Sequence, residues 1–144
     1  MLTAPLVICH TVMELVQDQV VSPGRLKSDL EVTDDVNVGV QTILVHSYSR
    51  VVIQALVYAH SQKKRFSVYV TESRPYGLGI KTHALLTAAG IESIVILDSA
   101  VAWIMGKVDL CLVGSEAVCE SGGLVNFIGS YQMAITAKAC GKPL

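Results

Sequence analysis

Charged and aromatic residues are both scarce in this chain. Only 16% of its 144 residues are charged and 6% are aromatic, and 11 basic residues against 12 acidic ones leave a formal net charge of −1. A protein that binds nucleic acid needs a concentrated basic surface for the phosphates, so the composition gives no support for a nucleic-acid partner. Intrinsic disorder is also excluded, because the chain is rich in Val, Ile and Leu.

Cysteine pairs and long apolar segments are missing as well. The four cysteines, Cys9, Cys111, Cys119 and Cys140, form no CxxC pair and no zinc-site spacing with the histidines. We therefore expect no metal, no cofactor and a reducing compartment, the cytoplasm. The longest uncharged stretch, residues 121–137, contains glycines and polar residues that make it a poor membrane span. No basic segment precedes the apolar residues at the N-terminus, so we expect no signal peptide.

Apolar residues are abundant for a chain of this size. They make up 51% of the sequence, and the mean hydropathy is +0.51. A parallel sheet covered on both faces would account for this excess, and so would surface buried against partner chains. We expect both.

Short β-branched runs alternate with segments of helical periodicity from Val40 onward. Four such runs predict strands, at residues 40–45, 66–71, 94–97 and 110–113. The intervening segments predict a helix capped by Ser49, a helix that ends before Gly90, a short helix capped by Asp98 or Ser99, and a last helix from Ser130 to Gly141. Repeated strand–helix units predict an α/β Rossmann-like fold, a parallel sheet with flanking helices.

Two parts of the chain differ in this pattern. Residues 40–144 form the predicted α/β domain, and we expect it to be incomplete at its C-terminus because the alternation calls for another strand after Leu144. Residues 1–39 predict one amphipathic helix, within residues 7–21, and a linker. This N-terminal part is not assigned to a domain.

The first candidate site lies where the second predicted strand ends. The segment TESRPYGLG, residues 71–79, leads from this strand into a helix. Ligands in open α/β sheets bind outside the carboxyl ends of strands, and Arg74 could contact a phosphate beside the free N–H groups around Gly79. The alternative is an ordinary connection with a surface arginine.

The second candidate site follows the fourth predicted strand. Its residues are Glu116, which could bind sugar hydroxyls or act as a base, and a set that includes several glycines: Gly122, Gly123, Asn126 and Gly129. The alternative is a loop whose glycines only supply turn geometry. Neither candidate segment is a GxGxxG or Walker loop, so both lack the main feature of dinucleotide and P-loop sites.

A third segment pairs His46 with Ser47 at the end of the first predicted strand. A hydrolase reading lacks the GxSxG nucleophile elbow, and neighbouring strand residues point to opposite faces. We therefore expect a helix cap with a buried polar neighbour.

These segments together resemble the alpha subunits of eukaryotic translation initiation factor 2B. The matching segments, in order, are ILVHSYSRVV at 43–52, KKRFSVYVTES at 63–73, LDSAV at 97–101, VGSE at 113–116, GG at 122–123 and QMA at 132–134. The resemblance implies a regulatory, non-catalytic subunit of a guanine-nucleotide exchange complex. Implied partners are the beta and delta subunits, a second copy of the chain and initiation factor 2, whose phosphorylated form the complex senses.

The wider family includes sugar-phosphate isomerases that act on methylthioribose 1-phosphate and ribose 1,5-bisphosphate. The resemblance places their catalytic cysteine at Ser47 and their catalytic aspartate at Glu116, so it implies that this chain is not an enzyme. A binding outline for a sugar phosphate or nucleotide remains at Arg74, Gly79, Gly122, Gly123, Asn126 and Gly129. Phe127 stands where relatives commonly have lysine, which should weaken the site.

Overall fold

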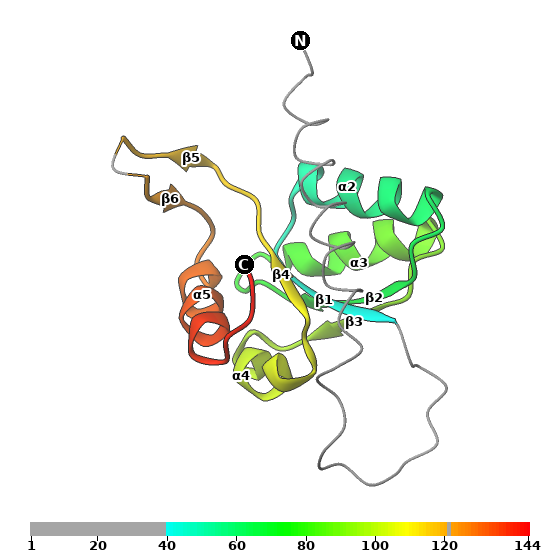
Figure 1. The fold of residues 1–144 in the computed structure, drawn as a ribbon. Helices are drawn as coiled ribbons and strands as arrows, with labels where there is room; N and C mark the ends of the chain where they lie inside the picture. Colours follow the sequence, from blue (N-terminus) through cyan, green and yellow to red (C-terminus); the bar gives the residue numbers. More distant parts are fainter. Residues whose placement is uncertain (1–39, 121) are drawn as a thin grey trace, which may run out of the picture.

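The computed structural model describes residues 40–120 and 122–144, and these form a four-stranded sheet with helices on both faces (Figure 1). The strands are β1 (Gln41–His46), β2 (Phe66–Thr71), β3 (Ser93–Ile96) and β4 (Leu110–Leu112), all parallel and in the order β3-β2-β1-β4. The predicted α/β fold is confirmed. The expected helix and linker within residues 1–39 lie outside the described residues.

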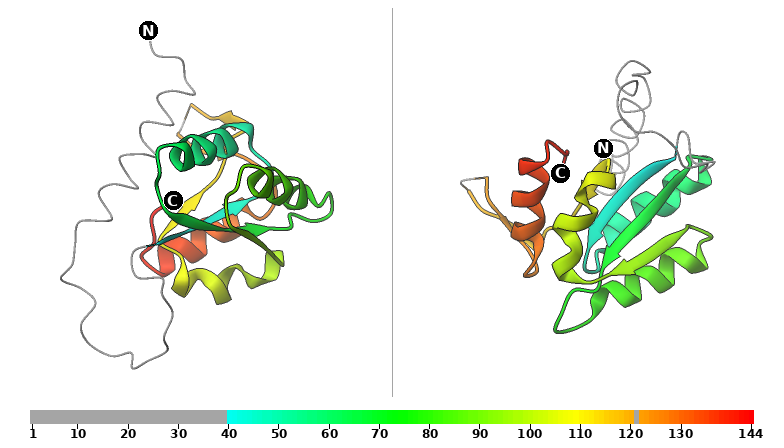
Figure 2. Two further views of the ribbon diagram at one scale, coloured as in Figure 1. Left: turned by 90° about the vertical axis from the view of Figure 1, so that its right-hand side faces the viewer. Right: turned by 90° about the horizontal axis from the view of Figure 1, so that it is seen from below.

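Each face of the sheet has its own core. Helices α2 (Arg50–Ser61) and α3 (Leu78–Ala88) cover one face, and α4 (Val101–Ile104) and α5 (Ser130–Ala139) cover the other (Figures 1 and 2). Strand residues alternate between the two cores, so that Ile43 packs under α2 while its neighbour Leu44 packs under α4 and α5. Both side chains are fully buried.

Helix α2 begins where the sequence predicts. Ser49 has extended backbone angles (φ −135°, ψ 122°), and its hydroxyl accepts a hydrogen bond from the Val52 N–H. The C-terminal end of the chain is hydrogen-bonded to β4. The carbonyl of Pro143 accepts from the Cys111 N–H at 2.9 Å. Burial raises the pKa of the Cys111 thiol to about 11.

The prediction that Asp98 or Ser99 caps a short helix is wrong. The segment after β3 forms a 3-10 turn (Asp98–Ala100), then α4, then a second 3-10 turn (Met105–Lys107), and no side chain caps the start of any of these three elements. The Asp98 carboxylate instead accepts hydrogen bonds from the Ser73 and Arg74 N–H groups, at 2.8 and 2.7 Å. The Asp98 carboxylate therefore holds the loop after β2 in place through these two hydrogen bonds.

A small hairpin stands where the sequence predicts only a glycine-bearing loop. Strands β5 (Ala117–Val118) and β6 (Leu124–Val125) pair antiparallel and project away from the sheet (Figure 1). Each strand has two residues, too few for a periodic pattern to be detected in the sequence.

No helix between residues 40 and 144, Ser121 aside, is long and apolar enough to cross a membrane.

Candidate functional site

The order of the strands creates a crevice between β1 and β4. The chain leaves β1 toward β2 on one side, and it returns from β3 to β4 on the other side, so the loops after β1 and β4 separate at the carboxyl edge of the sheet. Such a switch point is the usual ligand site of open α/β sheets. A polar cavity of about 200 Å³ lies here; we call it the switch-point pocket, and its lining residues are His46, Ser47, Tyr48, Ser49, Arg50, Val51, Gly114, Ser115, Glu116 and Asn126.

Ser47 is the most unusual residue of this pocket. It has a left-handed backbone conformation (φ 63°) and is 4% exposed, yet its hydroxyl has no hydrogen-bond partner among the described residues. A buried hydroxyl without a partner is unfavourable by about 1–3 kcal/mol, a penalty that a bound ligand can remove. Its carbonyl, in contrast, accepts a 2.7 Å hydrogen bond from the Thr82 hydroxyl.

His46 is engaged elsewhere and does not serve Ser47. Its Nε2 lies 2.7 Å from the carbonyl of Ile128, which can only accept, so Nε2 carries the proton of that bond. In the neutral ring, Nδ1 then accepts from the Thr71 hydroxyl at 2.6 Å. With both nitrogens occupied, the ring cannot activate a nucleophile, in agreement with the prediction of a buried polar neighbour beside a helix cap.

Charges of both signs surround the mouth of the pocket. Arg50, at the start of α2, and Glu116 both line it and are exposed. The Lys81 ammonium lies 4.1 Å from the ring centroid of Tyr48, which is also part of the lining. The 12-residue helix α2 adds the partial positive charge of its N-terminus. Cations, a helix N-terminus and a carboxylate together suit a ligand that carries both an anionic group and hydroxyls.

The residues predicted from the sequence are only partly brought together. Glu116 and Asn126 line the switch-point pocket, and Gly129 lies next to it, beside the ring of His46. Gly122 and Gly123 lie in the exposed turn of the hairpin.

Arg74 lies in the loop after β2 and Gly79 in the first turn of α3, and neither residue lines this pocket or the groove described next. The Arg74 Nε donates to Glu72 Oε2 at 3.0 Å, and its side chain is 64% exposed. The Gly79 N–H donates to the Glu72 carbonyl at 3.1 Å. Arg74 and the Gly79 N–H therefore have partners within the protein.

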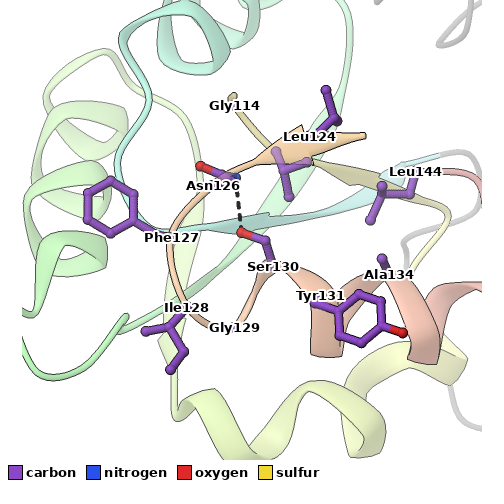
Figure 3. Close-up of a pocket in the computed structure, with 11 residues that line it drawn as sticks. Gly114, Leu124, Asn126, Phe127, Ile128, Gly129, Ser130, Tyr131, Ala134 and Leu144 are labelled. Carbon is purple, nitrogen blue, oxygen red and sulfur yellow. Dashed lines mark hydrogen bonds between the residues drawn. The ribbon is translucent and has the colours of Figure 1, made fainter. Parts of the chain in front are cut away.

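A second, mainly apolar cavity of about 370 Å³ adjoins the pocket (Figure 3). We call it the apolar groove; its lining residues are Val113, Gly114, Leu124, Asn126, Phe127, Ile128, Gly129, Ser130, Tyr131, Ala134 and Leu144. None of these side chains is charged. Gly114 and Asn126 line both cavities, and the Asn126 Nδ2 donates to the Ser130 hydroxyl at 2.9 Å (Figure 3).

The sequence predicts a helix cap with a buried polar neighbour in residues 46–50, and the Ser49 cap confirms it. The structure adds that these residues form much of the pocket lining. Their position at the carboxyl end of a predicted strand was the sequence feature that could have identified them as part of a ligand site. No group of three or more His, Cys, Asp or Glu that could hold a metal ion occurs within the described ranges.

Residues 35–144 match the model of the Initiation factor 2 subunit family. The chain belongs to this family. The eIF2B subunit alpha of Dictyostelium discoideum is 57% identical over 102 residues, which are 71% of this chain and 32% of that protein. The ribose 1,5-bisphosphate isomerase of Archaeoglobus fulgidus is 38% identical over 102 residues, or 71% of this chain and 33% of the isomerase. The resemblance stated above is thus confirmed.

Solved structures show the same fold. The translation initiation factor eIF-2B of Pyrococcus horikoshii OT3 superposes with a TM-score of 0.71 at 31% identity, over 72% of this chain and 38% of that chain. A subunit of the tetrameric eIF2B beta2-delta2 complex of C. thermophilum gives 0.72 at 22% identity, over 96% and 38%. The chain spans about a third of the length of the curated family members that it matches.

Proposed function

We propose that this chain acts in the cytoplasm as a regulatory, non-catalytic subunit of the initiation factor 2B guanine-nucleotide exchange complex. Its partners are the beta and delta subunits, a second copy of itself and initiation factor 2, whose phosphorylated form the complex senses. The 57% identity to the Dictyostelium alpha subunit is the observation that carries this proposal. The C. thermophilum structure supports it, because subunits of this fold assemble there into one complex.

An exposed apolar surface that includes part of the groove lining is suited to the pairing of two copies. Its residues, which we call the assembly face, are each at least 50% exposed: Val118, Leu124, Val125, Ile128, Tyr131, Ile135 and Leu144. Exposed apolar side chains that gather on one surface mark interaction sites. Because no side chain in the set is charged, two copies of the face meet without repulsion between like charges, as a two-fold symmetric contact requires.

Self-association tests this proposal. We expect the chain to form a dimer at tens of micromolar, and Tyr131→Glu to raise the dimer Kd about 30-fold, because an aromatic anchor contributes about 2 kcal/mol or more to an interface. Tyr76→Glu is the matched control, since Tyr76 is as exposed as Tyr131 (77% and 79%) but lies in the loop before α3. Sedimentation velocity measures both, and a monomeric wild-type chain at this concentration would rule out the homodimer.

The switch-point pocket is proposed to bind a sugar phosphate or a nucleoside monophosphate. The unpartnered Ser47 hydroxyl and Glu116 would receive hydroxyls of the ligand, and Arg50 with the α2 N-terminus would receive its phosphate. Asn126 would contact the ligand from the opposite wall. The sequence-predicted contacts at Arg74, Gly79, Gly122, Gly123 and Gly129 stay part of the proposal.

Calorimetric titration with ribose 5-phosphate and AMP tests this site. Loss of one charged contact changes affinity by about ten- to a hundred-fold, so Arg50→Ala should weaken binding by that factor and Phe127→Lys should strengthen it. Arg74→Ala should weaken it less, because Arg74 pairs with Glu72 and lines neither cavity. Equal affinity in the wild type, Arg50→Ala and Phe127→Lys would exclude a functional anion site.

The rival function is a sugar-phosphate isomerase with altered catalytic groups. The 38% identity to a ribose 1,5-bisphosphate isomerase favours it, and Ser47 and Glu116 do lie in one pocket. A serine hydroxyl without a base is a far weaker acid or nucleophile than a thiolate, and both nitrogens of His46 are occupied. Turnover of ribose 1,5-bisphosphate that Glu116→Gln abolishes would establish the rival function.

A further inference from the structure

Three of the 11 basic residues of the chain are consecutive, Lys63, Lys64 and Arg65. We call them the basic cluster, and they connect the end of α2 to the start of β2. Lys63 and Arg65 are exposed, and Lys64 is half-buried. None of the three forms a salt bridge with a carboxylate of residues 40–120 or 122–144. The negative end of α2 offsets only about half an elementary charge, so these residues leave most of the positive charge of the cluster uncompensated.

The start of β1 is fixed beside the basic cluster. Gln41 is paired with Phe66 in the parallel register, and its N–H donates to the Arg65 carbonyl at 3.4 Å. On the other side, the Thr42 N–H donates to Asp109 Oδ2 and the Asp109 N–H donates to the Thr42 carbonyl, both at 2.8 Å. The chain therefore enters the sheet at a defined point next to Arg65. The Asp109 carboxylate is engaged there and does not pair with the cluster.

The residues that precede this entry point are acidic. Residues 29–35, which lie outside the described ranges, hold four of the 12 acidic residues and no basic one. We call them the acidic segment; its carboxylates belong to Asp29, Glu31, Asp34 and Asp35. An extended residue spans about 3.3 Å, so Asp35 can lie up to about 20 Å from Gln41. Asn37 and Gly39, between these two, are residue types that favour turns. The acidic segment is therefore long enough to fold back onto the basic cluster.

We propose that the acidic segment docks on the basic cluster of its own chain, at the amino edge of β1 and β2. Four carboxylates there meet three cations, so the two charges are complementary. The linkage through residues 36–40 gives the segment an effective concentration in the millimolar range at the cluster. Acidic segments of other copies compete only at their bulk concentration, which is about 100-fold lower when the protein is at about ten micromolar. The segment of the same chain is therefore the favoured occupant.

This contact goes beyond the proposed function and does not rest on it. A docked segment neutralises the basic cluster, and another anionic molecule binds there only if it displaces the segment. The contact lies at the amino edge of the sheet, whereas the switch-point pocket lies at the carboxyl edge. The two are therefore separate surfaces of the domain.

The strength of the contact depends on salt. A single exposed ion pair contributes little, but two such pairs together change an equilibrium about five-fold. The screening length falls from about 30 Å in about 0.01 M salt to about 3 Å in about 1 M salt. We therefore expect the segment to be docked at low salt and released at high salt.

Carbodiimide cross-linking of the full chain tests the proposal. The reagent joins a carboxylate to a lysine amine in contact with it through an amide bond, and it takes up the water that is lost. Mass spectrometry of the digested protein then measures the yield of links from the first three carboxylates of the acidic segment to the two lysines of the basic cluster. We expect this yield to be at least about five-fold higher in about 0.01 M salt than in about 1 M salt.

Two charge reversals test the contact without removing any of the linked groups. Arg65→Glu replaces an attraction by a repulsion, so it should lower the yield at low salt about five-fold, and Asp35→Arg should do the same. The two substitutions together restore opposite charges and should return the yield to within about two-fold of the wild type. Lys138→Glu is the matched control, because Lys138 is also exposed but lies near the end of α5. It changes the net charge as Arg65→Glu does, and its yield should equal that of the wild type.

Four results would overturn the proposal. A yield that is equal at both salt concentrations, or that Arg65→Glu leaves unchanged, shows proximity through the linkage alone. An equal loss in Lys138→Glu shows an effect of net charge. Links between labelled and unlabelled peptides, in a mixture of isotope-labelled and unlabelled protein, show that a second copy supplies the segment. Absence of any link between the two segments shows that they do not meet.

Discussion

Gly79→Ala should prevent stable folding of the chain. A Cβ at this position would overlap the carbonyl oxygen of Thr71 and would lie 2.8 Å from its carbon and 3.0 Å from the Glu72 Cα. All three atoms are backbone, and Thr71 is the fully buried last residue of β2, so no side chain can rotate to make room. We expect a loss of at least about 4 kcal/mol, a large part of the 5–15 kcal/mol by which domains are stable.

Gly106→Ala is the matched control for this experiment. No atom lies within 4 Å of a Cβ added there, and Gly106 is exposed in the second 3-10 turn. Its unfolding free energy in urea should stay within about 0.5 kcal/mol of the wild type. If Gly79→Ala unfolded at the same urea concentration as Gly106→Ala, the α3 backbone at Gly79 could not lie as close to the Thr71 backbone as the structure places it.

Gly79 also shows how a structural role can look like a binding role in a sequence. A glycine after a strand and at a helix start predicts backbone N–H groups that are free for an anion. In the structure, the Gly79 N–H donates a hydrogen bond to the Glu72 carbonyl. The lack of a side chain allows α3 to pack directly against the backbone of Thr71 and Glu72. The sequence correctly indicates that a glycine is needed at this position. The reason is the backbone of Thr71, at the end of the preceding strand, which leaves no room for a Cβ.

The strands and long helices were predictable because their causes are local. Strand β2 was predicted with the same bounds as observed, because a short run of apolar and β-branched residues is by itself typical of a buried strand. The Ser49 cap depends on a residue three positions away. Asp98 was misassigned for the opposite reason: its partners, Ser73 and Arg74, lie 25 and 24 positions earlier, where no periodic pattern can reveal them.

The composition of the candidate site depended on strand order, which the sequence does not show. Parallel strands place all their carboxyl ends at one edge, and on that basis Arg74 and Glu116 could share a site. The observed order β3-β2-β1-β4 puts the switch point between β1 and β4. Glu116 follows β4 and lines the pocket, whereas Arg74 follows β2 and does not. Residues 46–50 line the pocket for the same reason, because they follow β1, the other strand at the switch point.

Leu44→Ala should lower the unfolding free energy by about 2–5 kcal/mol, because it leaves a cavity at a site that cannot collapse. Leu44 is fully buried on a central strand, where it pairs with Tyr69 on β2 and Cys111 on β4. Urea denaturation measures the loss, and Leu97→Ala is the control, since Leu97 is 60% exposed. A loss no larger than that of the control would contradict the assigned core.

The same substitution distinguishes the two faces of the sheet. Leu44 packs in the core that holds Met133 and Ala137 of α5, whereas its neighbour Ile43 packs in the core under α2 and α3. Leu44→Ala should therefore weaken self-association as well as stability, because it loosens the helix that presents Tyr131 and Ile135. Ile43→Ala should destabilise the chain to a similar extent, yet leave the dimer Kd of the folded fraction unchanged. Sedimentation velocity of both variants, below the onset of unfolding, compares them, and equal weakening of the dimer by both would show that α5 does not form the interface.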